Sequence, residues 1–209
     1  MLKVKICGIT NLEDALLAEK LGVDMLGFVF FAKSPRYLSP AKLAKITVRL
    51  SPLTRKVGVF VNEPERKVLE AAEKLKLNFV QLAGNENGAY VKTIQKSFPV
   101  IKAFQIGEDF QLLRLQKSSA DLKLADTKAG GLYGGSGQSF NWRRLSDLKG
   151  NARLVLAGGI GADNLRQAYE VLRPAAVDLT SSVEAWPGKK DSAKMKQFFE
   201  VANEIRLGR

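Results

Sequence analysis

The chain has 209 residues, 45% of them apolar, with one cysteine, no histidine and a formal net charge of +12. This length and apolar content suffice for one buried core, and we expect residues 1–209 to form a single domain. Without histidine, histidine-based acid–base chemistry, histidine metal sites and Cys/His zinc clusters are excluded, so we expect no metal. The lone cysteine excludes an internal disulfide, which is typical of a reducing compartment.

Charge patterning bears on location and partners. The N-terminus alternates charged and apolar residues without the apolar core of a signal peptide, and no apolar stretch is long enough to cross a bilayer. We therefore expect a cytoplasmic protein that does not engage a membrane. The basic residues are mixed with acidic ones, as in residues 63–67, which favours a lysine-rich solvated surface over a nucleic-acid site. DNA or RNA binding remains the alternative, and the positive field also suits a small anionic substrate.

Short apolar segments alternate with amphipathic ones along the whole chain. Eight of them are predicted to be strands buried on both faces: residues 3–7, 25–30, 56–61, 79–82, 100–104, 122–125, 153–157 and 176–179. Their spacing of about 20–30 residues matches a βα unit. Eight such units predict an α/β fold, a closed (βα)8 TIM barrel. An open doubly wound sheet is the alternative, although its G-x-G-x-x-G fingerprint is missing after the first strand.

Helix-start signals lie between the predicted strands. A capping box at residues 10–13, with Thr10 as the N-cap, predicts a first helix whose apolar face carries Ala15, Leu16, Ala18 and Leu21. Further starts are predicted at Ser39-Pro40, at residues 62–65 and 162–165, and at Asp191-Ser192.

Two titratable residues end predicted strands, at the edge where parallel α/β proteins bind ligands. Cys7 closes the first strand and is either a reactive thiol or a packed core residue. Asp126 follows the sixth strand and is either a general acid or base, or a cap of a turn. The glycine-rich residues 127–137 that follow it are either a lid over the substrate or a disordered insertion. Arg36, after the second strand, either grips a carboxylate with its planar guanidinium or lies on the surface.

The last two strands end in residues that suit a phosphate. Gly158 and Gly159 follow the seventh strand, and Ser181 and Ser182 follow the eighth. Glycine lets backbone N–H groups approach an oxyanion, and a following helix N-terminus favours negative charge. Barrels often bind phosphate at these two loops, so we interpret them as a phosphate site, with tight turns as the alternative.

Several segments in register now resemble one family. They are Lys5-Ile6-Cys7-Gly8-Ile9-Thr10, residues 27–30 with 34–37, residues 57–61, Asp126-Thr127 with residues 134–137 and Phe140, residues 156–160, and residues 177–179, 181, 183–184 and 187–190. Taken together, the chain resembles the phosphoribosylanthranilate isomerase family of tryptophan biosynthesis nearly end to end. The resemblance implies a TIM barrel that needs no metal or organic cofactor, and a small anionic phosphosugar as its partner. We expect a monomer or a homodimer.

The resemblance also implies roles for individual residues. The family converts N-(5-phosphoribosyl)anthranilate, an aminoaldose, into the aminoketose by an Amadori rearrangement. By motif, Asp126 would be the general acid that opens the furanose ring, and Cys7 the general base at C2 of the sugar. The substrate would be bound by Arg36 at its carboxylate and by Gln81, Gly135, Gly158, Gly159, Asp178, Ser181 and Ser182 around the sugar and phosphate.

These roles require particular ionisation states. An unperturbed thiol is only about 3% ionised at pH 7, so we expect cationic neighbours and the helix near Thr10 to lower the pKa of Cys7. Asp126 has to keep its proton, and burial under the lid or a nearby anion would raise its pKa, with the carboxylate and the phosphate of the substrate as the candidate anions.

The chain departs from the family pattern in the anthranilate pocket, near residue 141 and after the eighth strand, where the usual Ser-Ser-Gly reads Thr180-Ser181-Ser182. Ala83 replaces a histidine in the anthranilate pocket, Asn141 replaces an aspartate, and Ser182 replaces a glycine whose conformation would be strained for serine if it needs a positive φ. A related isomerase of histidine biosynthesis uses two aspartates, and Cys7 argues against it. A non-catalytic or altered-specificity phosphosugar-binding barrel is the remaining alternative.

Overall fold

The computed structural model describes residues 1–127 and 141–209. Its eight parallel strands close into one barrel in the order β1 to β8, with β1 paired to β8. They are β1 (Lys3–Cys7), β2 (Met25–Val29), β3 (Arg55–Phe60), β4 (Phe79–Leu82), β5 (Val100–Ile106), β6 (Leu122–Thr127), β7 (Leu154–Leu156) and β8 (Ala176–Leu179). Each lies within two residues of its predicted bounds, and the predicted (βα)8 barrel is confirmed.

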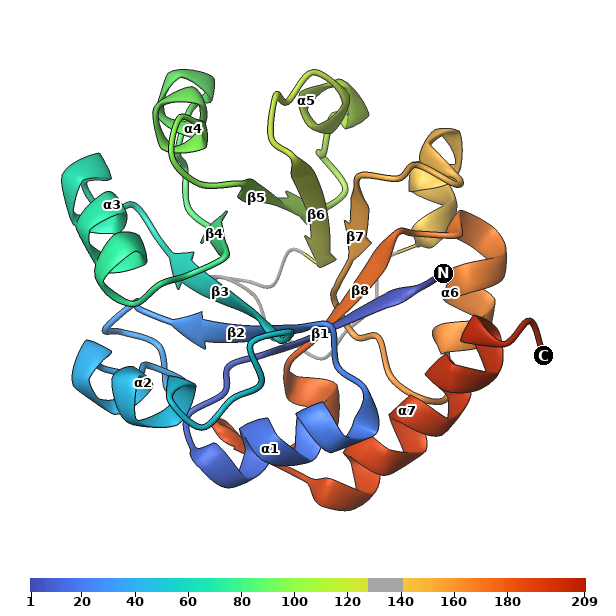
Figure 1. The fold of residues 1–209 in the computed structure, drawn as a ribbon. Helices are drawn as coiled ribbons and strands as arrows, with labels where there is room; N and C mark the ends of the chain where they lie inside the picture. The colour runs from blue at the N-terminus through green and yellow to red at the C-terminus, as the bar shows by residue number, and fades with distance from the viewer. Residues whose placement is uncertain (128–140) are drawn as a thin grey trace.

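Helices surround the barrel, as Figure 1 shows in a view along its axis. They are α1 (Leu12–Leu21), α2 (Pro40–Thr47), α3 (Glu65–Lys74), α4 (Gly88–Gln95), α5 (Leu112–Gln116), α6 (Leu165–Leu172) and α7 (Ser192–Arg206). The remaining regular elements of the described residues are two 3₁₀ segments and one antiparallel hairpin. The 3₁₀ segments are η1 (Trp142–Leu148) and η2 (Ser181–Val183), and the hairpin consists of β9 (Glu184–Trp186) and β10 (Lys189–Lys190). No helix in residues 1–127 or 141–209 has the length and apolar character needed to cross a membrane.

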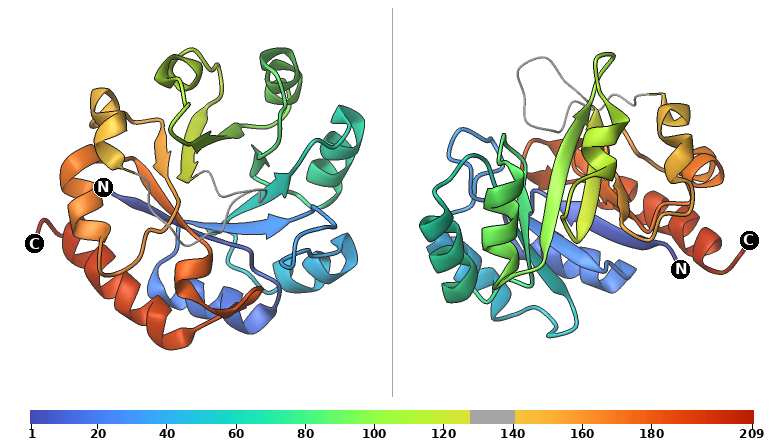
Figure 2. Two further views of the ribbon diagram at one scale, coloured as in Figure 1. Left: turned by 180° about the vertical axis from the view of Figure 1, so that it is seen from behind. Right: turned by 90° about the horizontal axis from the view of Figure 1, so that it is seen from above.

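The two ends of the chain lie on the same side of the barrel in both views of Figure 2. Arg206, at the end of α7, links the two ends: its Nε donates a hydrogen bond of 3.0 Å to the carbonyl oxygen of Leu2. A second nitrogen of the same guanidinium, Nη2, contacts the Asp24 carboxylate at 2.6 Å. The C-terminal helix is thus bound to the residues that precede β1 and β2, although these segments are far apart in sequence.

Side-chain caps begin α1, α2, α4 and α7, with one correction to the prediction, whereas α3 and α6 begin in their predicted segments without a side-chain cap hydrogen bond. Ser39 caps α2 with Pro40 at its first position, and Asp191 caps α7, both as predicted. The cap of α1 is Asn11 rather than Thr10, because the Asn11 side chain accepts a hydrogen bond of 2.9 Å from the backbone N–H of Asp14. The Thr10 hydroxyl donates instead to the carbonyl oxygen of Gly188 in the hairpin turn.

The predicted apolar face of α1 is wrong at one residue, Leu16. Ala15 and Ala18 are fully buried, as predicted, whereas Leu16 is 39% exposed. Leu16 follows Ala15 directly, and neighbouring residues on a helix point about 100° apart, so the two cannot share one face.

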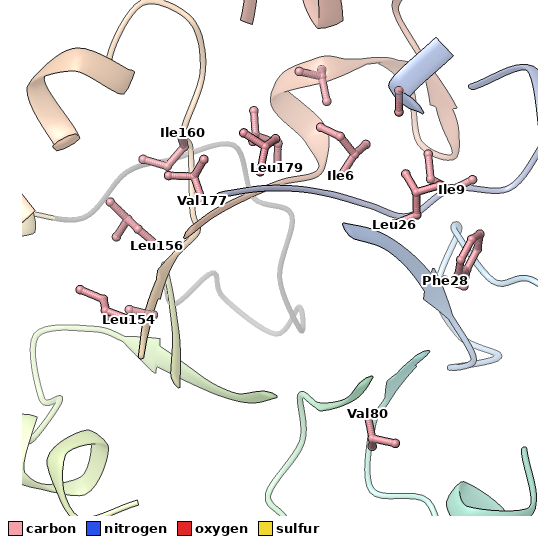
Figure 3. Packing of buried hydrophobic residues seen from close by; sticks show 14 of the residues in the cluster. Ile6, Ile9, Leu26, Phe28, Val80, Leu154, Leu156, Ile160, Val177 and Leu179 are labelled. Atoms are coloured by element: carbon pink, nitrogen blue, oxygen red, sulfur yellow. The ribbon is translucent and has the colours of Figure 1, made fainter. Parts of the chain in front are cut away.

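Alternation along the strands separates two apolar layers. Side chains such as Val4 and Ile6 point outward into the layer between strands and helices, part of which Figure 3 shows with Leu156 and Val177. A smaller interior cluster, which includes Met25, fills the centre of the barrel. Residues of the opposite parity to Val4 and Ile6, which include Lys5 and Cys7, face this interior.

Candidate active site

A pocket opens at the carboxyl ends of the barrel strands, the edge where the sequence placed the site. Every barrel strand, or the loop that follows it, contributes to its wall. Nine predicted site residues line it: Cys7, Arg36, Gln81, Asp126, Gly158, Gly159, Asp178, Ser181 and Ser182. The tenth, Gly135, and most of the predicted lid at residues 127–137 lie outside the described residues.

Cys7 shares its strand face with a buried lysine. Lys5 is fully buried two residues earlier on β1, and its Nζ donates to both oxygens of Asp178 on β8, at 2.8 and 2.9 Å. Gly27 on β2 makes room for this arrangement, because a Cβ there would lie 2.8 Å from Cys7 Sγ and 3.0 Å from Lys5 Nζ. The thiol and the ammonium therefore meet in a space that only glycine leaves open.

The ionisation of Cys7 differs from the expectation. Burial raises the pKa of the Cys7 thiol above its usual value, and the nearby Asp178 carboxylate adds to the increase. Lys5 and Lys190 act in the opposite direction but do not offset burial. The expected lowering of the thiol pKa is therefore wrong, because desolvation of the thiolate outweighs its cationic neighbours.

Asp126 shows the expected shift. Burial, followed by repulsion from Asp178, raises its pKa to about 6. A hydrogen bond of 2.8 Å from the backbone N–H of Thr127 to Oδ1 and the charge of Lys5 limit the increase. The anion that helps Asp126 to hold its proton is thus a residue of the protein itself.

Gly158 brings the seventh strand close to Asp126. Its φ is +78°, and a Cβ there would lie 2.6 Å from the backbone nitrogen of Thr127 and 3.0 Å from Asp126 Oδ1. Gly159 also has a positive φ, of +65°. These two positions need glycine for conformation, and the first also needs it for space.

The loop after β7 and the 3₁₀ turn after β8 lie next to each other. Asn164, the N-cap of α6, folds the first loop back: Gly161 donates its N–H to Asn164 Oδ1 at 2.9 Å, and Asn164 Nδ2 donates to the Gly159 carbonyl at 2.7 Å. Ser182, in the second segment, does not have a positive φ. The backbone at Ser182 is therefore not strained in the way that a positive φ would require.

Arg36 is held by a residue that the sequence analysis did not assign to the site. Its Nε and Nη2 donate to the Glu184 carboxylate on β9, with closest contacts of 2.9 and 2.6 Å. This uses one edge of the guanidinium and leaves the end that carries Nη1 without a hydrogen bond among the described residues. Gly8, with a φ of +74°, permits the contact, because a Cβ there would lie 2.6 Å from the Arg36 Cδ. Arg36 is thus positioned beside the pocket wall rather than on the outer surface.

Lys190 extends this network to the backbone of Cys7. Its Nζ donates to the carbonyl oxygens of Cys7 at 2.6 Å and Thr180 at 3.2 Å, and to Glu184 Oε1 at 3.0 Å. Burial would raise the pKa of Glu184, but Arg36 and Lys190 together lower it, so Glu184 is ionised. The sequence analysis missed Lys5, Glu184 and Lys190, although the period-two alternation of β1 places Lys5 on the face of Cys7.

The opposite wall of the pocket is apolar. Val29 and Val59 pack beside Cys7, with Phe31 and Ala83 against them. Gln81 stands at the edge of this wall, and its Oε1 is buried without a hydrogen-bond partner among the described residues. The pocket therefore offers an apolar surface and an unsatisfied acceptor on one side, and charged groups on the other.

Comparisons with known proteins agree with this geometry. Residues 4–201 match the family model described as N-(5'phosphoribosyl)anthranilate (PRA) isomerase. An N-(5'-phosphoribosyl)anthranilate isomerase of Thermotoga petrophila is 45% identical over 206 residues, which cover 98% of this chain and all of that protein.

Solved structures agree as well. The crystal structure of phosphoribosyl anthranilate isomerase from Thermus thermophilus superposes with a TM-score of 0.90 at 37% identity, covering 98% of this chain and 100% of the other. A further structure, of the isomerase in complex with reduced 1-(o-carboxyphenylamino)-1-deoxyribulose 5-phosphate, has a TM-score of 0.84 at 41% identity and covers 97% of this chain and 99% of the other. The chain thus belongs to the N-(5'-phosphoribosyl)anthranilate isomerase family, the isomerases that act in tryptophan biosynthesis.

Proposed function

We propose that this protein converts N-(5-phosphoribosyl)anthranilate into 1-(2-carboxyphenylamino)-1-deoxyribulose 5-phosphate, with Asp126 as general acid and Cys7 as general base. The observation that carries the proposal is that both side chains, from β6 and β1, face one pocket in a chain of this family. Asp126 has a pKa of about 6, which suits a group that donates a proton near neutral pH.

The reaction divides between the two groups. Asp126 gives its proton to the furanose ring oxygen, the bond from that oxygen to C1 breaks, and the nitrogen lone pair forms a Schiff base at C1. The Cys7 thiolate then removes the proton from C2, the released electron pair forms the C1–C2 double bond, and the C1–N π electrons return to nitrogen, which gives an enolamine. Tautomerisation moves the proton of the C2 hydroxyl to C1 and leaves a ketone at C2. The proton on Cys7 returns to Asp126 through solvent, so neither substrate nor enzyme gains or loses a proton or an electron over the cycle.

The substrate fits the pocket in one direction. The free end of Arg36 suits the carboxylate of the anthranilate, whose ring packs on Val29, Val59 and Ala83. The phosphate lies across the barrel mouth at the residues that follow β7 and β8: Gly158, Gly159, Ser181 and Ser182.

Polar groups between these two ends face the sugar. Gln81 Oε1 accepts a hydrogen bond from the amine N–H or a hydroxyl of the substrate, which satisfies a buried acceptor. Asp178 also lines the pocket. Gly135 belongs to the proposed binding set by the family resemblance alone, because it lies outside the described residues.

The two ionisations have a consequence for the pH dependence. The productive enzyme carries a protonated Asp126 and an ionised Cys7, although Asp126 loses its proton at lower pH than Cys7 does. Below about pH 6 Asp126 stays protonated and the ionised fraction of Cys7 rises with pH, so kcat/KM rises. Between the two pKa values the ionised fraction of Cys7 still rises, but the protonated fraction of Asp126 falls equally fast, so kcat/KM stays constant. Above the pKa of Cys7 only that fall remains, so kcat/KM has an acidic limb near pH 6, a plateau and a basic limb set by Cys7.

A steady-state assay on N-(5-phosphoribosyl)anthranilate tests the proposed activity. The substrate is made in the assay mixture, because the N-glycosidic bond of an aminoaldose hydrolyses readily. We expect saturable turnover to the aminoketose. The second candidate is a phosphosugar-binding barrel without this activity, which Ala83 in the anthranilate pocket favours. Binding of the reduced product analogue without turnover above background would contradict the proposed function and support the second candidate.

A further inference from the structure

The proposed mechanism leaves unused a lysine in the interior of the barrel. Lys5 is 0% exposed and lies on the strand face of Cys7, with Gly27 opening the space between Sγ and Nζ. Burying an ammonium costs free energy unless it is paired. Asp178 supplies the carboxylate that pairs with Lys5.

The hydrogen bonds of the two nearby lysines differ. An ammonium has three N–H donors. Lys190 directs its donors to the carbonyl oxygens of Cys7 and Thr180 and to Glu184. Lys5 directs its donors to one carboxylate, that of Asp178, and so retains a donor for the sulfur atom beside it.

We infer that Lys5 is a positioning residue that stabilises the thiolate of Cys7, with Asp178 as the partner that holds the ammonium in place and limits its effect. This inference rests on the proposed role of Cys7 as the base. It adds to that role a named cation, which a chain without histidine needs in order to ionise its only cysteine.

The other charges around Cys7 do not replace Lys5. Asp178 from β8 and Asp126 from β6 are carboxyl groups, and Lys190 from β10 is bound to Glu184, which also binds Arg36. Among the influences on the Cys7 pKa, burial is the largest and Lys5 is the largest that opposes it. Asp178 acts with burial, so Lys5 and Asp178 are expected to shift the thiol in opposite directions.

The test measures the Cys7 pKa directly, from the pH dependence of alkylation by iodoacetamide, read by mass spectrometry. Cys7 is the only cysteine, so the added mass reports one site, and Cys7→Ala provides the blank. Lys5→Met alone leaves an unpaired buried carboxylate, so the main variant is Lys5→Met/Asp178→Asn, which removes both charges together. Lys5 outweighs Asp178 among the influences on the Cys7 pKa, so their joint removal does not cancel. We expect the thiol pKa of this variant to rise by about one unit, which is about tenfold slower alkylation at a fixed pH below that value.

A matched control removes a second buried ion pair. Lys102 contacts Glu86 at 2.9 Å, with side chains 8% and 2% exposed, and neither residue contributes to the pocket wall around Cys7. Lys102→Met/Glu86→Gln should leave the thiol pKa of Cys7 at the wild-type value. If the Lys5→Met/Asp178→Asn protein, folded by circular dichroism, titrates like wild type or like this control, the inference is overturned.

Kinetics give a second readout. In the Lys5→Met/Asp178→Asn protein the basic limb of kcat/KM should move upward by the same unit as the thiol pKa. Loss of packing or of a substrate contact lowers the plateau without moving the limb, and that result would contradict the inference. Alkylation needs no substrate, so an unmoved thiol pKa refutes the inference, whereas absent wild-type turnover refutes the proposed function.

Discussion

The two sides of the pocket handle buried charge in different ways. On the side of β8, β1 and the β9–β10 hairpin, Lys5 pairs with Asp178, and Glu184 pairs with both Arg36 and Lys190. On the side of β6 and β7, the carboxylate of Asp126 receives one hydrogen bond that the structure shows, from the Thr127 backbone. On the first side opposite charges pair directly. On the second side, burial raises the pKa of an acid that has no cation bound to it among the described residues.

This difference bears on the proposed roles of Asp126 as acid and Cys7 as base. A group that has to give a proton gains from burial without a cationic partner, as at Asp126. A group that has to lose a proton needs nearby cations, as at Cys7. The two residues come from strands on different sides of the barrel mouth, so each has its own surroundings. At Cys7 the cations oppose the effect of burial without offsetting it.

The largest effect is expected from breaking the compensated side. Asp178→Ala leaves the Lys5 ammonium buried without its partner, so the free energy of unfolding should fall by about 3–5 kcal/mol. Urea denaturation measures the loss. The control is Glu70→Ala, which breaks the exposed Arg66–Glu70 pair on α3 and should cost no more than about 0.5 kcal/mol. Equal losses in the free energy of unfolding would show that the buried Lys5–Asp178 pair contributes no more to stability than the exposed pair does.

A smaller effect of opposite sign is expected at Asp126. Its pKa in the folded protein, about 6, exceeds the unfolded value of about 3.9, so ionisation costs stability. The cost is absent below the unfolded value and complete above about pH 6, where it approaches about 3 kcal/mol. Asp126→Asn should therefore stabilise the fold at pH 8 and leave it nearly unchanged at pH 4. Urea denaturation at both pH values checks this, and the same difference at each would exclude ionisation of Asp126 as the cause.

The smallest effect on stability separates two reasons for a glycine: a positive φ, and the lack of space for a Cβ. Gly150→Ala and Gly158→Ala both place alanine at a positive φ, which costs about 1 kcal/mol. A Cβ at Gly150 meets nothing within 4 Å, whereas one at Gly158 meets Thr127 and Asp126. Steady-state assays should show kcat/KM at least about tenfold lower for Gly158→Ala, because Asp126 is displaced, and little change for Gly150→Ala. Similar activities would indicate that Asp126 does not depend on the space at Gly158.

Much of the barrel could be predicted because its strands are short apolar runs at a regular spacing. The strand ends then located Cys7 and Asp126, since parallel strands bring their carboxyl ends to one edge. The cap of α1 could not be fixed, because the Thr10 hydroxyl is used by Gly188, a residue far away in the sequence.

The charged network was missed for a similar reason. The pairing of Lys5 with Asp178 depends on the register of β1 against β8, which places these two residues opposite each other. Glu184 and Lys190 lie in a hairpin after the eighth strand, where no apolar pattern indicates their place. Only the alternation along β1 could have pointed to Lys5 from sequence.

The central claim is that Cys7 and Asp126 are the base and the acid of one reaction. The most direct measurement compares kcat/KM for Cys7→Ala and Asp126→Asn with the affinity of each variant for the reduced product analogue. The account predicts losses in kcat/KM of about 10²–10⁴ for each variant, with analogue dissociation constants within a few-fold of wild type. Turnover by either variant close to the wild-type rate would contradict it.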